Sequence, residues 1–214
     1  MEKQTSLSYD RLSQILHWLT AVAVTIAFIL GPGGFGRLMR QGVDPGTRSD
    51  IVWHESLGVL VFLLTIARLV WLVRRPARPT FSIPPWMNLT SRLIQGAMWV
   101  LMLVLPLTAI LSLGSEGHPL TLLGGLRIER MPIIADSSIA HVVDWGDLHG
   151  WLGDALMWIA GLHAAAAIFH RVVLKDGVLA AMLPFVGPPS RGQAGGADAA
   201  RGARLRHRTD AGPE

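Results

Sequence analysis

Four histidines lie within or at the mouth of long apolar stretches of this 214-residue chain: His17, His54, His149 and His163. Ionisable side chains are rare in membrane-spanning segments, and where they occur they usually serve a function. The alternative is that a neutral histidine hydrogen-bonds to a neighbouring helix and does no chemistry. Four histidines in one chain favour the functional interpretation over the structural one.

The apolar stretches that carry these histidines predict an all-α membrane protein. Half of the residues are hydrophobic and only 16% are charged, whereas soluble domains average about 25%. Four stretches have the roughly 20 residues needed to cross a bilayer. They cover residues 12–31, 51–73, 93–113 and 148–174. We therefore expect a four-helix transmembrane bundle over residues 9–184, followed by a disordered basic tail at 185–214.

The distribution of basic residues predicts the orientation. Of the 19 Lys and Arg residues, two precede or open the first span, four follow the second, and seven lie in the C-terminal segment. The positive-inside rule therefore places both termini in the cytoplasm and the acidic loop 114–147 outside. The net charge of +4 does not indicate nucleic-acid binding, because the basic residues sit between apolar stretches. It favours contact with membrane lipid headgroups instead.

Topology and helical rise sort the four histidines into two levels. His17 enters the membrane early on a helix that starts inside, whereas His54 and His149 enter early on helices that start outside. His163 follows His149 by 14 residues, a rise of about 21 Å and nearly four whole turns. It therefore returns to the level of His17 on the same helical face. The spacing predicts an outer pair, His54 with His149, and an inner pair, His17 with His163.

Two imidazoles at each level suit haem better than other metal groups. The chain has no cysteine, which excludes iron–sulfur clusters, cysteine-ligated zinc and covalent c-type haem. Zinc needs three or four ligands at one depth, and the Glu-x-x-His pairs of di-iron bundles are absent. Haem iron accepts one imidazole on each face, so the pattern predicts two stacked haem sites and hence an electron relay.

Small residues one helical turn beyond each histidine agree with this interpretation. Ala21, Gly58, Gly153 and Ala167 each follow one of the four histidines by four positions. A small side chain there leaves room for a flat macrocycle against the helix. Small residues are also common wherever membrane helices pack, so the support is limited.

Four sequence blocks carry a resemblance to a known family. They are YDRLSQILHWL at 9–19, WHESLG at 53–58, GDLHGWLG at 146–153 and GLHAAAAIFHRVVLKDGVLAAMLP at 161–184. Together they resemble the bacterial cytochrome b561 family, four-helix di-haem proteins related to the cytochrome b subunits of nickel–iron hydrogenases. The resemblance implies b-type haem, axial ligation at His17, His54, His149 and His163, and a place in the bacterial cytoplasmic membrane. One departure is Gly150, where relatives carry an acidic residue.

The resemblance also implies the reaction, which is one-electron transfer between an external partner and quinone. In some family members the partner is superoxide, and the chain is then an oxidoreductase of the superoxide:quinone type. A second hypothesis is an electron-transfer anchor that receives electrons from a redox partner protein such as a dehydrogenase or hydrogenase. A third, from another class, is a haem-free transporter or structural bundle.

Two further ionisable residues lie near the predicted inner site. Arg68 follows His54 by 14 positions, so it shares the inner level and the same face. It either binds a haem propionate or a quinone, or it extends to the cytoplasmic headgroups. His170 lies near the inner surface, where it either supplies protons for quinone reduction or caps the helix end. His118, His141 and His207 are predicted to be loop or tail residues without a metal role.

Overall fold

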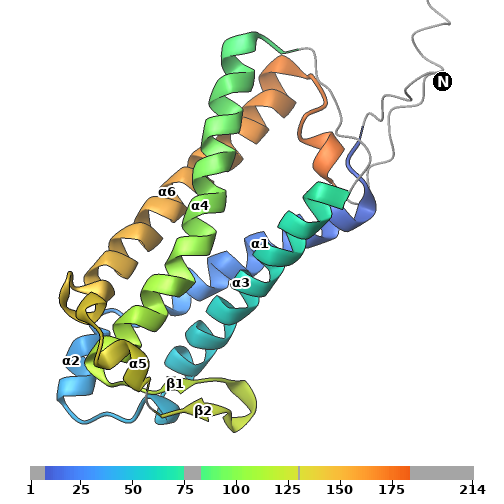
Figure 1. Cartoon of the computed structure of the whole chain (residues 1–214). Coiled ribbons are helices and arrows are strands. Elements are labelled where there is room, and N and C mark those ends of the chain that lie inside the picture. The colour runs from blue at the N-terminus through green and yellow to red at the C-terminus, as the bar shows by residue number, and fades with distance from the viewer. Residues whose placement is uncertain (1–7, 75–82, 130, 184–214) are drawn as a thin grey trace, which may run out of the picture. The chain divides into compact units, whose positions relative to one another are not determined.

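The computed structural model describes residues 8–74, 83–129 and 131–183, all within one compact unit that spans Met1–Pro184 (Figure 1). Its four long helices are α1 (Arg11–Leu30), α3 (Ser49–Arg74), α4 (Pro85–Glu116) and α6 (Trp145–Phe169). All four are long and apolar enough to cross a membrane, which confirms the predicted all-α membrane fold. The tail predicted at residues 185–214 lies outside the described residues.

The helix ends differ from the predicted spans most clearly in α4. This helix begins at Pro85 and ends at Glu116, whereas apolarity alone predicted residues 93–113. Proline suits the first helical turn because that turn needs no backbone N–H. The helix stops at Gly117, which takes the left-handed conformation (φ 69°) that glycine adopts readily.

Aspartate side chains cap the two helices that carry three of the four histidines. Asp10 accepts a hydrogen bond from the backbone N–H of Ser13 at the start of α1, and Asp144 accepts one from Asp147 at the start of α6. Such caps satisfy backbone donors that have no partner within the helix. At its other end α6 continues as a π-helical turn, η4 (His170–Leu174), which stops at Lys175 in a left-handed conformation.

The long helices pack as two antiparallel pairs. α1 lies along α3, and α4 lies along α6, while fewer contacts, mainly between α3 and α4, join the pairs (Figure 1). The fully buried side chains include Ile51, Thr20 and Thr65. Both threonine hydroxyls donate to carbonyls of their own helix, so no polar hydrogen is left unbonded there. Many large apolar side chains point outward, as expected where lipid replaces water.

Short elements gather at one end of the helices, which we call the hairpin end. They are α2 (Phe35–Arg40), η1 (Pro45–Thr47), β1 (Leu120–Thr121), η2 (Leu123–Gly125), β2 (Arg127–Ile128), α5 (Pro132–Ala135) and η3 (Ser138–His141). β1 and β2 are antiparallel, with Leu120 opposite Ile128 and Thr121 opposite Arg127. Hydropathy alone predicts loops for these segments.

The opposite end is closed by residues 177–183, which we call the strap. The strap includes η5 (Ala180–Met182) and lies against the start of α1. The carbonyl of Ala181 accepts hydrogen bonds from the backbone of Tyr9 and the side chain of Gln14, and the carbonyl of Met182 accepts one from the indole of Trp18. The strap therefore joins the end of α6 to the beginning of α1.

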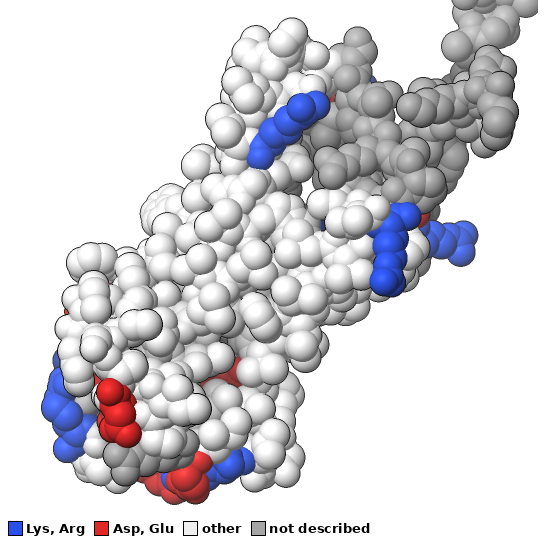
Figure 2. Space-filling model, in the orientation of Figure 1, with Lys and Arg blue, Asp and Glu red and all other residues white. Residues whose placement is uncertain are grey.

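Charged side chains concentrate at the two ends. Figure 2 shows that most of the visible surface between them carries no Lys, Arg, Asp or Glu, while acidic side chains gather at the hairpin end. An uncharged belt with many exposed large apolar side chains matches the hydrocarbon region of a bilayer.

Candidate functional site

The structure brings His54 of α3 and His149 of α6 together near the hairpin end. Their ring centroids are 6.0 Å apart and the ring planes are inclined at 84°. His54 Nδ1 lies 2.7 Å from the carbonyl oxygen of Ala27, and His149 Nδ1 lies 3.0 Å from that of Leu105. A carbonyl oxygen can only accept, so each Nδ1 carries the hydrogen and each lone pair is on Nε2. Nε2 is then free to bind a metal, and the backbone holds the ring in place.

The carbonyl that orients His54 is free because α1 ends there. In a continuing helix the N–H of Gly31 would bond to Ala27, but it donates to the carbonyl of Phe28 instead. The carbonyl that orients His149 belongs to the residue before Pro106, inside α4. Thr108 donates its hydroxyl to the same carbonyl and lies 3.3 Å from His149 Nδ1.

His17 of α1 and His163 of α6 lie nearer the strap end. They are within electrostatic range of each other and of Arg68. One guanidinium nitrogen of Arg68 is 3.4 Å from His17 Nδ1, and the guanidinium carbon lies 4.6 Å from the centre of the Trp99 ring. Arg68 thus lies between His17 and Trp99, and the pairing of His17 with His163 as haem ligands stays a prediction.

Open space beside the histidines fits a flat macrocycle. A Cβ atom built on Gly58 or Gly153, one turn beyond His54 and His149, would meet no atom within 4 Å. Paired imidazoles with free Nε2 atoms, next to glycines that leave space, fit a haem group.

His170 forms a close pair with Asp176 at the strap end. Its Nδ1 contacts one carboxyl oxygen of Asp176, and the other carboxyl oxygen accepts a hydrogen bond from the backbone N–H of Val178. Both side chains are largely buried. The π-helical turn and the left-handed Lys175 bring the two residues together. The sequence singled out His170 but not its partner, because the contact depends on this turn.

The β hairpin is hydrogen-bonded to the first turns of α3, next to His54. The backbone N–H of Thr121 donates to the carboxylate of Glu55, and that of Leu123 donates to the Ser56 hydroxyl. Arg127 also forms an ion pair with Asp44 (2.6 Å). The hydrogen bond from the Arg127 guanidinium, aided by the Gly46 amide, lowers the pKa of Asp44 below its ordinary value. Glu55 was not singled out from the sequence, since its partner is a loop amide 66 residues away.

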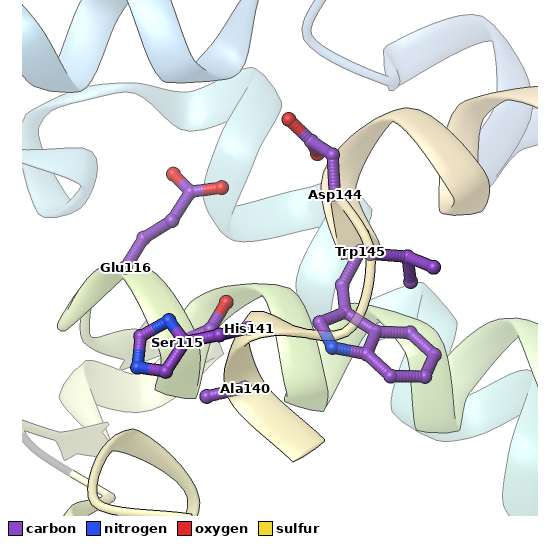
Figure 3. Close-up of a pocket in the computed structure, with 7 residues that line it drawn as sticks. Ser115, Glu116, Ala140, His141, Asp144 and Trp145 are labelled. Carbon is purple, nitrogen blue, oxygen red and sulfur yellow. The ribbon is translucent and has the colours of Figure 1, made fainter. Parts of the chain in front are cut away.

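The loop histidines occupy a separate place at the hairpin end. His141 lines an open pocket of about 350 Å³ together with Glu116, Asp144 and Trp145. Figure 3 shows the carboxyl groups of Glu116 and Asp144 on one side of this pocket and the two rings on the other. His118 pairs with Glu116 (3.2 Å). Within the described residues no group of three or more His, Asp or Glu side chains is arranged to hold a metal ion. His207 lies outside the described residues.

Comparisons with known proteins agree on one family. A family model described as prokaryotic cytochrome b561 matches residues 8–185. "Cytochrome b561 homolog 2" of Escherichia coli is 26% identical over 176 residues, covering 82% of this chain and 90% of the relative. "Probable superoxide oxidase CybB" of Yersinia pestis is 26% identical over 181 residues (82% and 96%). "Cytochrome b562" of Cereibacter sphaeroides is 29% identical over 187 residues (82% and 94%).

Proposed function

Because the chain belongs to the prokaryotic cytochrome b561 family, we propose that it is a di-haem cytochrome b that transfers electrons between an external donor and the quinone pool. Membership, with four apolar helices, makes it a haem-binding electron-transport protein that crosses the bacterial inner membrane several times. The resemblance stated from the motifs is thereby confirmed. A haem-free transporter does not agree with membership of a cytochrome family.

The observation that carries the proposal is the geometry of His54 and His149. Two imidazoles 6.0 Å apart, each with its Nδ1 bonded to a carbonyl, present two Nε2 donors to one metal. We assign them to the outer haem and assign His17 and His163 to the inner haem. When bound, haem iron takes up one electron and releases it again, which is the chemistry that a relay needs.

The residues around the inner site have separate proposed roles. Arg68 binds an anionic or carbonyl oxygen, either on a haem propionate or on quinone, because a guanidinium presents several fixed donors. His170 supplies a proton when quinone is reduced, and Asp176 orients its ring. In this proposal the hairpin end faces outward and the strap end faces the cytoplasm.

Two kinds of external electron donor are compatible with this proposal. Superoxide is suggested by the printed name of the Yersinia pestis relative. A redox partner protein is favoured by the acidic side chains of the hairpin end, because a negative surface slows the approach of an anion. These side chains belong to Glu116, Glu129, Asp136, Asp144 and Asp147.

Haem content tests the proposal directly. Purified protein should show a reduced b-type spectrum and about two haems per chain. His54→Ala and His149→Ala should each leave one haem, the same one in both variants, while His17→Ala and His163→Ala should each leave the other. His141→Ala, a matched control at the hairpin end, should keep both. A colourless protein, or loss of the same haem in His54→Ala and His17→Ala, contradicts the assignment.

A second measurement distinguishes the donors. Superoxide generated enzymatically is added to the oxidised protein with and without quinone, and the haem spectrum is followed. Fast haem reduction that superoxide dismutase abolishes supports superoxide as the donor. If the protein carries two haems and superoxide reduces neither, the donor is a partner protein.

A further inference from the structure

The proposed haem ligands His54 and His149 differ from His17 in what faces the Nδ1 atom. At the hairpin end both Nδ1 atoms face backbone carbonyls, those of Ala27 and Leu105. At the strap end the Nδ1 of His17 faces the guanidinium of Arg68. The hairpin-end site therefore places negative partial charges beside its ligand rings, whereas the strap-end site places a full positive charge beside the ring of His17.

From this asymmetry we infer that Arg68 makes the inner haem the easier of the two to reduce, and so sets the direction of electron transfer from the outer site to the inner site. The inference rests on the proposed di-haem function. It adds that one side chain, in contact with a ligand at one site only, establishes the driving force between the sites.

The charge of Arg68 is permanent and has no acidic partner in the described part of the chain. A guanidinium does not lose its proton in proteins. Arg68 lies in the last third of α3, six residues before the helix ends, and it contacts the Trp99 ring and His17. The aromatic face attracts the cation without neutralising it. Trp99 thus holds a full positive charge beside the strap-end ligand.

A nearby cation and a hydrogen-bonded carbonyl act on haem iron in opposite directions. Reduction removes one positive charge from the iron, so a neighbouring cation stabilises the reduced form, and strongly so in a medium of low dielectric constant. An N–H donated to a carbonyl makes the imidazole a more basic ligand, which stabilises the oxidised form. Arg68 therefore raises the inner potential, and the carbonyls of Ala27 and Leu105 lower the outer one.

Arg68 acts on His17 through its charge and not through a hydrogen bond. A guanidinium only donates, and an imidazole that binds iron through Nε2 carries its hydrogen on Nδ1, so the two groups cannot be hydrogen-bonded when His17 binds haem. At 3.4 Å their contact is at the long limit for a hydrogen bond. If Arg68 also pairs with a haem propionate, the direction is unchanged. Removing the guanidinium would then leave a propionate charge uncompensated, which lowers the inner potential further.

Potentiometric titration followed by absorption tests the inference on the purified full-length protein. Arg68→Gln should keep two haems and lower the midpoint potential of the inner haem. The equilibrium constant for electron transfer from the outer to the inner haem should then fall at least about tenfold, equivalent to 59 mV for one electron. Arg68→Lys should retain most of the difference because it keeps the charge. Arg74→Gln removes an exposed arginine from the same helix and should leave both midpoints unchanged.

A measurement without any Arg68 variant keeps the inference testable if Arg68→Gln does not fold. In His54→Ala the remaining haem is the inner one, and its midpoint should match the higher midpoint of the wild type. A match to the lower midpoint overturns the inference, as does Arg68→Gln with two haems and unchanged midpoints. In both cases the di-haem proposal stands, whereas wild-type protein without two haems refutes that proposal itself.

Discussion

The carbonyl oxygen of Ala27 has two structural consequences at the scale of single residues. It is left without a helical partner where α1 ends, and it accepts the Nδ1–H of His54. One hydrogen bond thus satisfies a carbonyl at the end of a helix and also orients a proposed haem ligand. A ring fixed before the cofactor arrives loses little further freedom on binding, which favours affinity.

The sequence predicted which residues meet, but not the atoms that orient them. The direction of each span paired His149 with His54, and 14-residue steps placed His163 and Arg68 near the level of His17, because helical rise and rotation are regular. Leu105 and Ala27 contribute backbone atoms, for which residue type gives no signal. Such partners become visible only when the helices are placed relative to one another.

A residue-scale prediction concerns the space at Gly153. Gly153→Phe should fill the room beside His149 with an aromatic ring and lower the haem content from about two to about one per chain. The matched control is Gly150→Phe, at an exposed position three residues earlier in α6. Both changes replace glycine by a better helix former, so helix propensity does not separate them. Haem counting on the purified variants checks the prediction, which is wrong if Gly153→Phe retains two haems.

At the scale of elements, hydropathy predicted the four helices but not their ends or the short segments. α4 extends eight residues before its apolar stretch because Pro85 starts a helix without regard to polarity. The β hairpin has two-residue strands and depends on bonds to Glu55 and Ser56 in α3. Local sequence carries too little information for elements that depend on tertiary contacts.

The strap gives the element-scale prediction. Gln14→Leu removes the buried side-chain donor to Ala181, while the Tyr9 N–H still reaches the same carbonyl. One hydrogen bond contributes about 1 kcal/mol net, so local opening of the strap should become about fivefold more frequent. Faster amide hydrogen exchange at Ala181–Leu183 would report this. Gln95→Leu, which removes a bond only to Ser91, should not change exchange there. Unchanged exchange in Gln14→Leu contradicts the prediction.

At the scale of the whole molecule, the uneven ends predict the orientation. Basic residues at the strap-end ends of the described helices are Arg11, Arg74, Arg92, Arg171 and Lys175, whereas acidic side chains gather at the hairpin end. Basic segments are retained in the cytoplasm, so the hairpin end should face the periplasm. Alkaline phosphatase inserted after Gly125 should therefore be active, and the same enzyme fused after Leu183 inactive. A fluorescent protein fused after Leu183 serves as the reciprocal control, and the reverse pattern would invert the proposed direction of electron flow.

The place of α6 in the chain has a consequence for biogenesis. Each proposed ligand pair takes one histidine from α6, the last of the four described long helices to leave the ribosome, and the strap that packs against α1 follows it. A nascent chain thus has no complete pair until α6 has entered the membrane. Haem can therefore bind both of its proposed ligands only late in maturation, after the four long helices have been synthesised. A chain truncated before Trp145 should therefore be purified without haem, even when its first three long helices are inserted.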